Sequence, residues 1–349
     1  MPAITSGKVL VSGANGYIAV WVVRKLLEAG FSVRGAVRAT DKGTHLTELF
    51  AEYGDKFEVV VVPDITKEGA FDEAVKGVDA IEHMASPFHF EADDPAELVA
   101  PAVQGTLGIL RSALKHGPTV KRVVVTSSCA AVLNVSDKPQ ILNETNWNDQ
   151  AVEEVEKMGN AASQRAKYRT SKTLAERSAW KFVEEHKSEI GWDLVCLNPP
   201  LVLGPMIHAV SSPSELNTSA RDLYDAFFTP GKAGGGGCWV DVRDLADAHV
   251  KALRREQAGG ERVILTAGPF SWQDWLDSVP TSDKFQKGTP GAGKDFVHLL
   301  RYDTRKSVEL LGMEYRPMKN TAEDVVKDWE ARGVVLAVGS DETVRRPRY

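Results

Sequence analysis

The opening of the chain constrains the fold most, because it places two glycines between a β-type run and a helical pattern. The apolar run at residues 8–12 leads directly into Gly13 and Gly16, and a mainly apolar stretch with interspersed charges follows at residues 20–29. Glycines in a strand-to-helix turn let the backbone approach a pyrophosphate, and the helix N-terminus attracts that anion. The spacing G-x-x-G-x-x-A, completed by the small residue Ala19, therefore predicts the first unit of a dinucleotide-binding fold.

Strand and helix patterns continue to alternate after this turn. The further predicted strands cover residues 31–38, 57–62, 80–86, 122–128 and 192–197, and the further predicted helices cover 46–53, 71–75, 96–115 and 166–186. We expect residues 57–62 to form a buried strand, and the polar stretch from Ser128 to about Ala161 to be irregular. Alternation at this spacing predicts a parallel, doubly wound sheet whose ligands bind beyond the carboxyl ends of the strands.

The alternation is lost in the C-terminal part of the chain, which predicts a second unit. We expect an α/β fold, with a Rossmann-type doubly wound parallel sheet and a smaller C-terminal substrate-binding lobe. The expected nucleotide-binding domain is 1–205, with 239–267 returning to it, and the expected lobe is 206–238 and 268–349. The lobe would carry helices near 303–311 and 321–331, a flexible glycine run at 234–237 and a disordered basic tail at 345–349.

Composition limits the class of partner. The 349 residues carry 42 basic and 48 acidic side chains, a formal net charge of −6, which argues against an extended nucleic-acid surface. No apolar run approaches the roughly 20 residues that span a bilayer, and the first residues lack a signal-peptide h-region. The three cysteines show no CxxC or Cys/His spacing, so neither disulfides nor a metal site are expected. We therefore expect a cytoplasmic protein without membrane or nucleic-acid partners, either a monomer or a homodimer.

The end of the second predicted strand indicates which dinucleotide binds. A unit specific for NAD usually carries an acidic residue there, which holds the ribose 2′-hydroxyl. This chain instead has Arg38, with Lys42 four residues on. Basic groups suit a 2′-phosphate, so the sequence favours NADP(H), although two solvated charges at a strand end would give the same pattern.

Tyr168 and Lys172 stand four residues apart in a run without Gly or Pro, so a helix would place both on one face. A nearby cation favours tyrosinate, and we expect Lys172 to lower the pKa of Tyr168 from its usual value of about 10. Such a tyrosine can transfer protons near neutral pH. Ser128, at the expected end of a central strand, would face the same crevice. Each feature alone has an ordinary structural explanation: a chance pair on a helix and a serine that ends a strand.

Three other reactive side chains are expected to have no catalytic role. Cys129 follows Ser128 directly but has no histidine-based activation pattern, so we do not expect a nucleophile. His83 and His89 lack partners at metal-ligand spacing and are expected to be structural.

Taken together, these stretches make the chain similar to the extended short-chain dehydrogenase/reductase superfamily. In particular, it resembles the dihydroflavonol-4-reductase-like branch, with its fungal carbonyl, methylglyoxal and isovaleraldehyde reductases. The resemblance covers nearly the full length. The matching stretches are GANGYIA at 13–19, VTSS at 125–128, YRTSK at 168–172, NPPLVLGP at 198–205, LNTS at 216–219 and WVDVRD at 239–244.

The resemblance implies a role for each matched position. Ser128, Tyr168 and Lys172 would form the catalytic set, and Lys172 would also bind the nicotinamide ribose. The pyrophosphate of the NADP(H) cofactor would be bound by Gly13, Ala14, Asn15, Gly16, Tyr17 and Ile18, and its 2′-phosphate by Arg38 and Lys42. Asp64 and Ile65 would contact the adenine. Pro199 and Val202 would position the nicotinamide, and Ser219 would reach the cofactor from a loop. The glycine run at 234–237 matches no motif of the family.

The expected activity is the NADPH-dependent reduction of an aldehyde or ketone to an alcohol, with Tyr168 as the proton donor. Candidate substrate-wall residues are Phe88, Phe90, Val132 and the loop 206–217, although ordinary packing would explain them equally well. Two alternatives remain. A sugar-nucleotide epimerase or dehydratase on the same fold is disfavoured, because a dehydratase would carry an acidic pair where Cys129 and Ala130 stand, and an epimerase would retain NAD. A non-catalytic NADP(H)-sensing protein would not need the Ser128, Tyr168 and Lys172 set.

Overall fold

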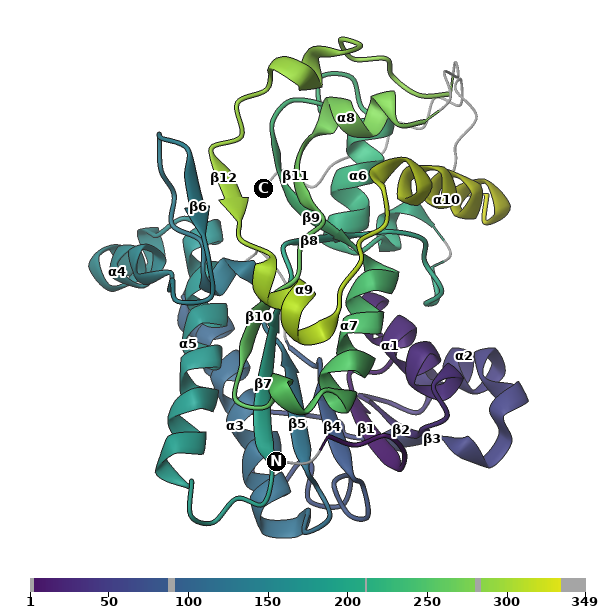
Figure 1. The fold of residues 1–349 in the computed structure, drawn as a ribbon, viewed down its shortest axis with the longest axis vertical. Helices are drawn as coiled ribbons and strands as arrows, with labels where there is room; N and C mark the ends of the chain where they lie inside the picture. The colour runs from purple at the N-terminus through teal and green to yellow at the C-terminus, as the bar shows by residue number, and fades with distance from the viewer. Residues whose placement is uncertain (1–2, 87–91, 211, 280–283, 334–349) are drawn as a thin grey trace.

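A seven-stranded parallel sheet forms the body of the protein (Figure 1). The computed structural model describes residues 3–86, 92–210, 212–279 and 284–333. The strand order is β10-β7-β5-β4-β1-β2-β3, and every neighbouring pair is parallel. The strands are β1 (Lys8–Ser12), β2 (Ser32–Val37), β3 (Phe57–Val61), β4 (Ala80–His83), β5 (Arg122–Thr126), β7 (Asp193–Asn198) and β10 (Arg262–Ile264). The predicted Rossmann-type doubly wound sheet is thus confirmed.

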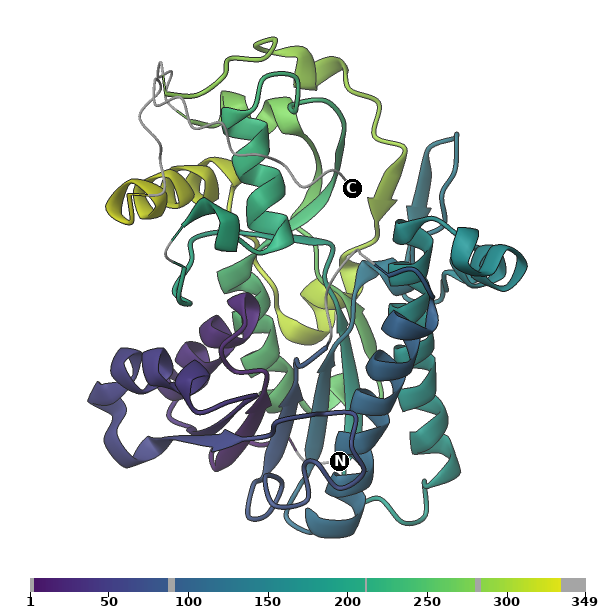
Figure 2. The same cartoon turned by 180° about the vertical axis from the view of Figure 1, so that it is seen from behind.

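Helices cover both faces of this sheet (Figures 1 and 2). Helices α3 (Ala96–His116) and α5 (Gln164–Glu185) pack together on one face, and α1 (Tyr17–Glu28) and α7 (Val242–Arg254) on the other, with α2 (Asp41–Leu49) near the β3 edge. Successive residues of a strand point to opposite faces. In β5, accordingly, Val123 and Val125 belong to the apolar cluster that includes α3, while Val124 belongs to the cluster that includes α1.

Two small sheets and further helices gather at one end of the molecule (top of Figure 1). The three-stranded sheet has the order β11-β9-β8, and β12 pairs in parallel with β6. These strands are β6 (Gln140–Leu142), β8 (Leu201–Leu203), β9 (Gly236–Asp241), β11 (Gly268–Ser271) and β12 (Leu300–Tyr302), and the helices at this end are α6 (Thr218–Phe228), α8 (Trp272–Asp277) and α10 (Met318–Ala331). Helices α4 (Asp149–Met158) and α9 (Arg305–Leu311) lie nearer the middle of the molecule (Figure 1), where α4 packs on α5 and α9 on β10 and α7. None of the helices in the described ranges is long and apolar enough to cross a membrane.

The structure departs from the predicted elements where packing overrides local pattern. Strand β3 is only partly buried, with Val61 45% exposed, because it is an edge strand paired with β2 alone. Residues 71–75 form turns and not a helix, although Phe71 and Val75 are fully buried. The stretch expected to be irregular contains β6 and α4; helix α4 lies mostly at the surface, with Ala151 as its single buried residue.

The glycine run at 234–237 was expected to be flexible, and half of it is regular strand. Gly236 and Gly237 belong to β9 and pair with Ser271 and Phe270 of β11. A Cβ atom at Gly236 would clash with the carbonyl oxygen of Phe270. Close approach of two backbones therefore explains a glycine at this position.

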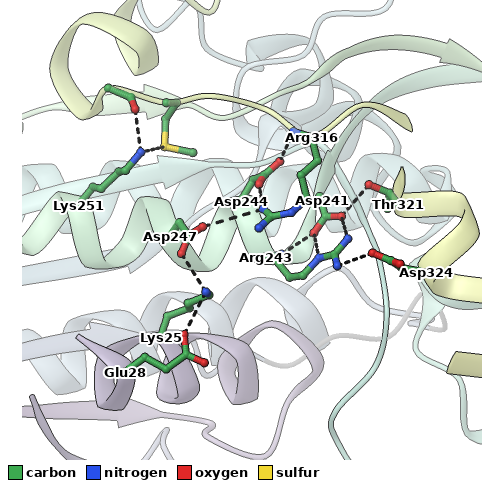
Figure 3. Close-up of polar contacts among 12 residues, drawn as sticks. Lys25, Glu28, Asp241, Arg243, Asp244, Asp247, Lys251, Arg316, Thr321 and Asp324 are labelled. Atoms are coloured by element: carbon green, nitrogen blue, oxygen red, sulfur yellow. Dashed lines mark hydrogen bonds and ion pairs between the residues drawn. The ribbon is translucent and has the colours of Figure 1, made fainter. Parts of the chain in front are cut away.

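A buried carboxylate ties α7 to the last described helix (Figure 3). Asp241 is fully buried and caps α7 by accepting a hydrogen bond from the Arg243 backbone N–H. Its Oδ2 accepts further hydrogen bonds from Arg243 Nη2 and from Thr321 Oγ1, both at 2.7 Å. Arg243 Nη1 lies 2.7 Å from Asp324 Oδ2 of α10. The cluster joins the main body to α10, since α7 also reaches α1 through Asp247 and Lys25 at 3.5 Å.

We expect Asp241→Ala to destabilise the fold by about 3 kcal/mol, because it leaves the half-buried Arg243 without its main partner and removes the cap of α7. Thermal or denaturant unfolding measures this change. The matched control is Lys157→Ala, which breaks an exposed 3.7 Å ion pair with Glu153 in α4 and should change stability by less than about 0.5 kcal/mol. Equal stability of the two variants would contradict the role of the cluster.

Candidate active site

The turn after β1 is built to approach a ligand closely. Gly13 has a φ of +65°, and a Cβ there would lie 3.0 Å from Ala85 Cα. Helix α1 begins at Tyr17, its N-cap residue is Gly16, and neither a side-chain cap nor an acidic residue occupies its first turn. The first N–H groups of α1 are therefore available to an anion.

One cavity of about 380 Å³ lies beyond the ends of β1, β2 and β3. Arg38 is exposed there and has no hydrogen bond or ion pair with any residue of the described ranges, while Lys42 Nζ lies 3.9 Å from Asp41 Oδ2. Asp64 accepts hydrogen bonds from the backbone N–H and Oγ1 of Thr66, which lower its pKa. The predicted residues that line this cavity are Gly13, Asn15, Arg38, Lys42, Asp64 and Ile65.

A second cavity, of about 260 Å³, brings the predicted catalytic set together. Ser128, Tyr168 and Lys172 line it, although they come from the end of β5 and from α5. The other predicted residues around it are Gly13, Gly16, Tyr17, Ile18, Pro199, Val202 and Ser219. Since Gly13 and Ser86 line both cavities, the two form one crevice along the carboxyl ends of the strands.

Ala14 is the one predicted cofactor-binding residue that lines neither cavity. Its side chain is fully buried, and its backbone N–H donates to Ala36 O at 3.0 Å. The residue thus joins the glycine turn to β2.

Ser128 is held just beyond the sheet. It lies two residues past the end of β5 and caps the short 3-10 turn Cys129–Ala131, where its Oγ accepts a 3.0 Å hydrogen bond from Ala130 N. The side chains of Ser128 and Tyr168 are hydrogen-bonded to each other. The two hydroxyl groups can therefore address one carbonyl oxygen.

Burial, and not the neighbouring cation, dominates the ionisation of Tyr168. Burial raises its pKa to about 12, and the hydrogen bond with Ser128 opposes this rise only in part. Burial lowers the pKa of Lys172 to about 8; its Nζ lies 5.9 Å from the centre of the Tyr168 ring and donates to Ser86 Oγ at 3.1 Å. The expected lowering of the Tyr168 pKa by Lys172 is therefore wrong for this structure, because burial penalises the charged tyrosinate and the Ser128 hydrogen bond offsets this only in part. At neutral pH Tyr168 is a phenol, the form that donates a proton.

Cys129 and His83 have the structural roles that were expected. Cys129 is 3% exposed, and its Sγ donates to Asn198 O at 3.1 Å; burial raises the pKa of the thiol well above its usual value. His83 Nδ1 lies 3.0 Å from Ser12 Oγ, and burial lowers the pKa of the ring to about 3. The described residues also hold no group of three His, Cys, Asp or Glu side chains that could bind a metal.

The expected substrate wall is met only in part. Val132 is fully buried and packs with Cys129, Leu142 and Ile264, so it belongs to the core. Phe88, Phe90 and His89 lie outside the described residues. Among the described residues of the loop 206–217, Asn217 is the one that lines the catalytic cavity.

Several residues of the crevice were given no specific role by the sequence. Ser86 contacts Lys172, Thr126 lines the catalytic cavity, and the Oδ1 atom of Asn217 is buried without a partner among the described residues. Asn217 stands directly before α6 but makes no side-chain cap. A polar residue at a strand end was a usable signal for Ser86, and the signal for Asn217 was its place in the LNTS stretch at 216–219.

Comparisons with known proteins agree with this geometry. Residues 9–268 match the model of the NAD dependent epimerase/dehydratase family. The ketoreductase azaE of Aspergillus niger is 37% identical over 340 residues, which cover 91% of this chain and 96% of that protein. The cinnamoyl-CoA reductase CAD2 of Medicago truncatula is 34% identical over 334 residues, with 91% and 94% covered.

Among solved structures, yeast methylglyoxal/isovaleraldehyde reductase Gre2 complexed with NADPH superposes with a TM-score of 0.85 at 34% identity, covering 94% of this chain and all of that one. Family model, relatives and fold agree over nearly the whole chain. The chain therefore belongs to the NAD dependent epimerase/dehydratase family of extended short-chain dehydrogenases/reductases, in the branch of the dihydroflavonol and cinnamoyl-CoA reductases.

Proposed function

We propose that this protein is an NADPH-dependent reductase that converts an aldehyde or ketone to an alcohol. One observation carries the proposal: a single crevice has a glycine turn suited to phosphate and an exposed Arg38 at one end, and Ser128, Tyr168 and Lys172 at the other. The printed names of the relatives point the same way, since one is a ketoreductase and another is a reductase crystallised with NADPH.

The residues present fit NADP(H). The uncapped N-terminus of α1 and the positive φ of Gly13 suit a pyrophosphate. Arg38 and Lys42 suit the 2′-phosphate, and Asp64 and Ile65 suit the adenosine between the ends of β2 and β3. Pro199, Val202 and Ser219 line the cavity next to the catalytic set, where the nicotinamide would lie, and the unpartnered Oδ1 of Asn217 offers a further hydrogen-bond acceptor. When bound, NADPH supplies the hydride that reduces the carbonyl carbon.

The chain's own residues handle the oxygen of the substrate. Tyr168 donates its phenolic proton to the carbonyl oxygen, because it is a phenol at neutral pH. Ser128 donates a hydrogen bond to the same oxygen, where negative charge develops. Lys172, a cation below about pH 8, binds the ribose hydroxyls and stabilises the tyrosinate left after proton transfer. In sum, the carbonyl carbon gains the hydride and its oxygen gains the proton.

Replacing Tyr168 tests this mechanism most directly. We expect Tyr168→Phe to lower kcat by about 10³-fold, because it removes the general acid, and to leave the dissociation constant for NADPH nearly unchanged. The assay follows NADPH absorbance with a panel of aldehydes, diketones, β-keto esters and dihydroflavonols. Tyr53→Phe, which removes a phenol far from the crevice, is the control and should keep full activity. Near wild-type turnover by Tyr168→Phe would rule out the mechanism.

Arg38 tests the choice of cofactor. We expect Arg38→Ala to lower kcat/KM for NADPH by about 10- to 100-fold, which corresponds to the loss of a charge-assisted hydrogen bond to phosphate. The value for NADH should change little, since NADH lacks the 2′-phosphate. Arg111→Ala, which removes an exposed cation outside the crevice, controls for the change in net charge. Equal efficiency of the wild-type protein with NADH and NADPH would contradict the role of Arg38.

The pH dependence follows from the protonation state of Tyr168. Alcohol oxidation needs tyrosinate as the proton acceptor, and a pKa of about 12 makes this the minor form at neutral pH. We therefore expect log kcat for oxidation to rise with pH through about pH 6 to 9, while carbonyl reduction, which uses the phenol, does not rise. In the wild-type protein the hydrogen bond with Ser128 lowers the pKa of Tyr168. Ser128→Ala removes this bond, so the pKa of Tyr168 should rise and the oxidation profile should move to higher pH. An oxidation rate independent of pH over this range would contradict the assignment.

A further inference from the structure

A buried carboxylate lies on the helix that carries the catalytic pair. Glu176 is only 1% exposed, and it follows Tyr168 and Lys172 in α5 at a regular spacing of four residues. Positions four apart lie on one face of a helix. Glu176 therefore points towards the sheet, as Tyr168 and Lys172 do, but it lines neither cavity of the crevice.

One carboxylate oxygen of Glu176 is linked both to Ser127 and to Ser128. Its Oε2 accepts hydrogen bonds from Ser127 Oγ at 2.6 Å and from Asn198 Nδ2 at 2.8 Å. The same Asn198 Nδ2 group lies 3.1 Å from the backbone carbonyl oxygen of Ser128. The carboxylate thus contacts the residue before Ser128 directly, and Ser128 itself through one amide.

The other oxygen is paired with a cation that is itself held in place. Glu176 Oε1 accepts from Arg262 Nε of β10 at 2.5 Å. Arg262 Nη1 donates to the carbonyl oxygens of Glu144 and Asn146 at 2.6 and 3.0 Å, and the guanidinium lies 3.6 Å from the centre of the Trp147 ring. A buried charge with this many partners is a defined anchor point and not a mobile side chain.

Ser128 needs such an anchor because it lies beyond the regular ladder of β5. The N–H of Ser127 donates to Leu197 O and that of Cys129 to Pro199 O, both at 2.8 Å, so the segment follows β7. These two backbone hydrogen bonds fix the position of residues 127–129 relative to β7 and the residues that follow it. The bonds through Glu176 join this segment to α5, in addition to the hydrogen bond between Ser128 and Tyr168.

We propose that Glu176 is a positioning residue, which holds the Ser128 hydroxyl in register with the Tyr168 hydroxyl so that both reach one carbonyl oxygen. This inference rests on the proposed reductase function. A displacement of about 1 Å in such a constellation can cost about 10²-fold in rate.

Glu176→Gln tests the proposal, because the variant keeps the shape of the side chain but has a single acceptor oxygen where donors from Ser127, Asn198, Arg262 and Trp180 converge. We expect kcat to fall by about 10- to 100-fold, while the dissociation constant for NADPH stays within about twofold of wild type. The oxidation profile should also move to higher pH, as in Ser128→Ala, because the hydrogen bond between Ser128 and Tyr168 is weakened. A merely structural role for Glu176 would leave this profile unchanged.

The matched control is Asp193→Asn. It disrupts another buried pair between strands β5 and β7, in which Arg122 Nε and Nη2 donate to Asp193 at 2.6 and 2.8 Å, at the ends of these strands far from the crevice. We expect this variant to lose stability but to keep kcat and the pH profile of the folded protein. If kcat falls in both variants in proportion to their loss of stability, the proposal is overturned.

Ser127→Ala is a milder second variant, which deletes one of the hydrogen bonds to Glu176. It should also lower kcat, and it provides the test if Glu176→Gln fails to fold. Amide hydrogen exchange of residues 126–131 gives a readout without turnover, and should be faster in both variants but not in Asp193→Asn. Unchanged exchange would overturn the positioning role even if no carbonyl compound were reduced. If Tyr168→Phe loses turnover while Glu176→Gln keeps full activity, the positioning role is overturned and the reductase function stands. If the wild-type protein shows no turnover, the reductase function alone is overturned.

Discussion

The whole crevice depends on the parallel pairing of the central strands. Strand β5 pairs with β4 on one side and β7 on the other, so that Val125 lies level with His83 and with Cys196. Because the three strands run in the same direction, the chain leaves the sheet at one edge each time. Ser86, Ser128 and Pro199 come from distant parts of the sequence, but this register places them around one cavity. A slip of one residue in any of these pairs would turn the side chains to the opposite face.

The same burial that makes the sheet stable sets the chemistry of the site. A fully parallel sheet is covered on both faces, so polar groups near its edge are desolvated. Tyr168 and Lys172 respond in opposite directions, the phenol becoming a weaker acid and the ammonium a stronger one, because each loses the hydration of its charged form. Buried carboxylates in this region have cationic partners, as Glu176 has Arg262. Such pairs add little net stability, but they define geometry.

Much of the fold and of the site could be predicted from the sequence, because the signals were local. The glycine turn, the strand ends and the i, i+4 pair in α5 each depend on neighbouring residues, and the structure brings them together as expected. The direction of the Tyr168 pKa could not be predicted, since it depends on how deeply α5 is buried. The ordered part of the glycine run was missed for a related reason: the partner that orders Gly236 is the distant strand β11.

Glu176 illustrates this limit most clearly. Its three strongest contacts come from the end of β5, the end of β7 and the start of β10, which are separated by up to 135 residues in sequence order and meet only in the folded sheet. A glutamate in a helix rich in charged residues looks like a solvated side chain until these strands are in place. Residues that position a reactive group are thus harder to recognise than the reactive group itself.

The contacts of α10 bear on how the protein folds. Met206 N donates to Asp328 Oδ2 at 2.9 Å and Arg332 Nη2 donates to Met206 O at 2.5 Å, across 122 and 126 residues of sequence. Two residues before Met206, the carbonyl oxygen of Gly204 accepts a hydrogen bond from the Tyr17 hydroxyl, across 187 residues of sequence. Closing such long loops is slow, because chain entropy is lost before the contacts form. The wall of the crevice behind the glycine turn therefore includes contacts that can form only after residues 328 and 332 have been synthesised.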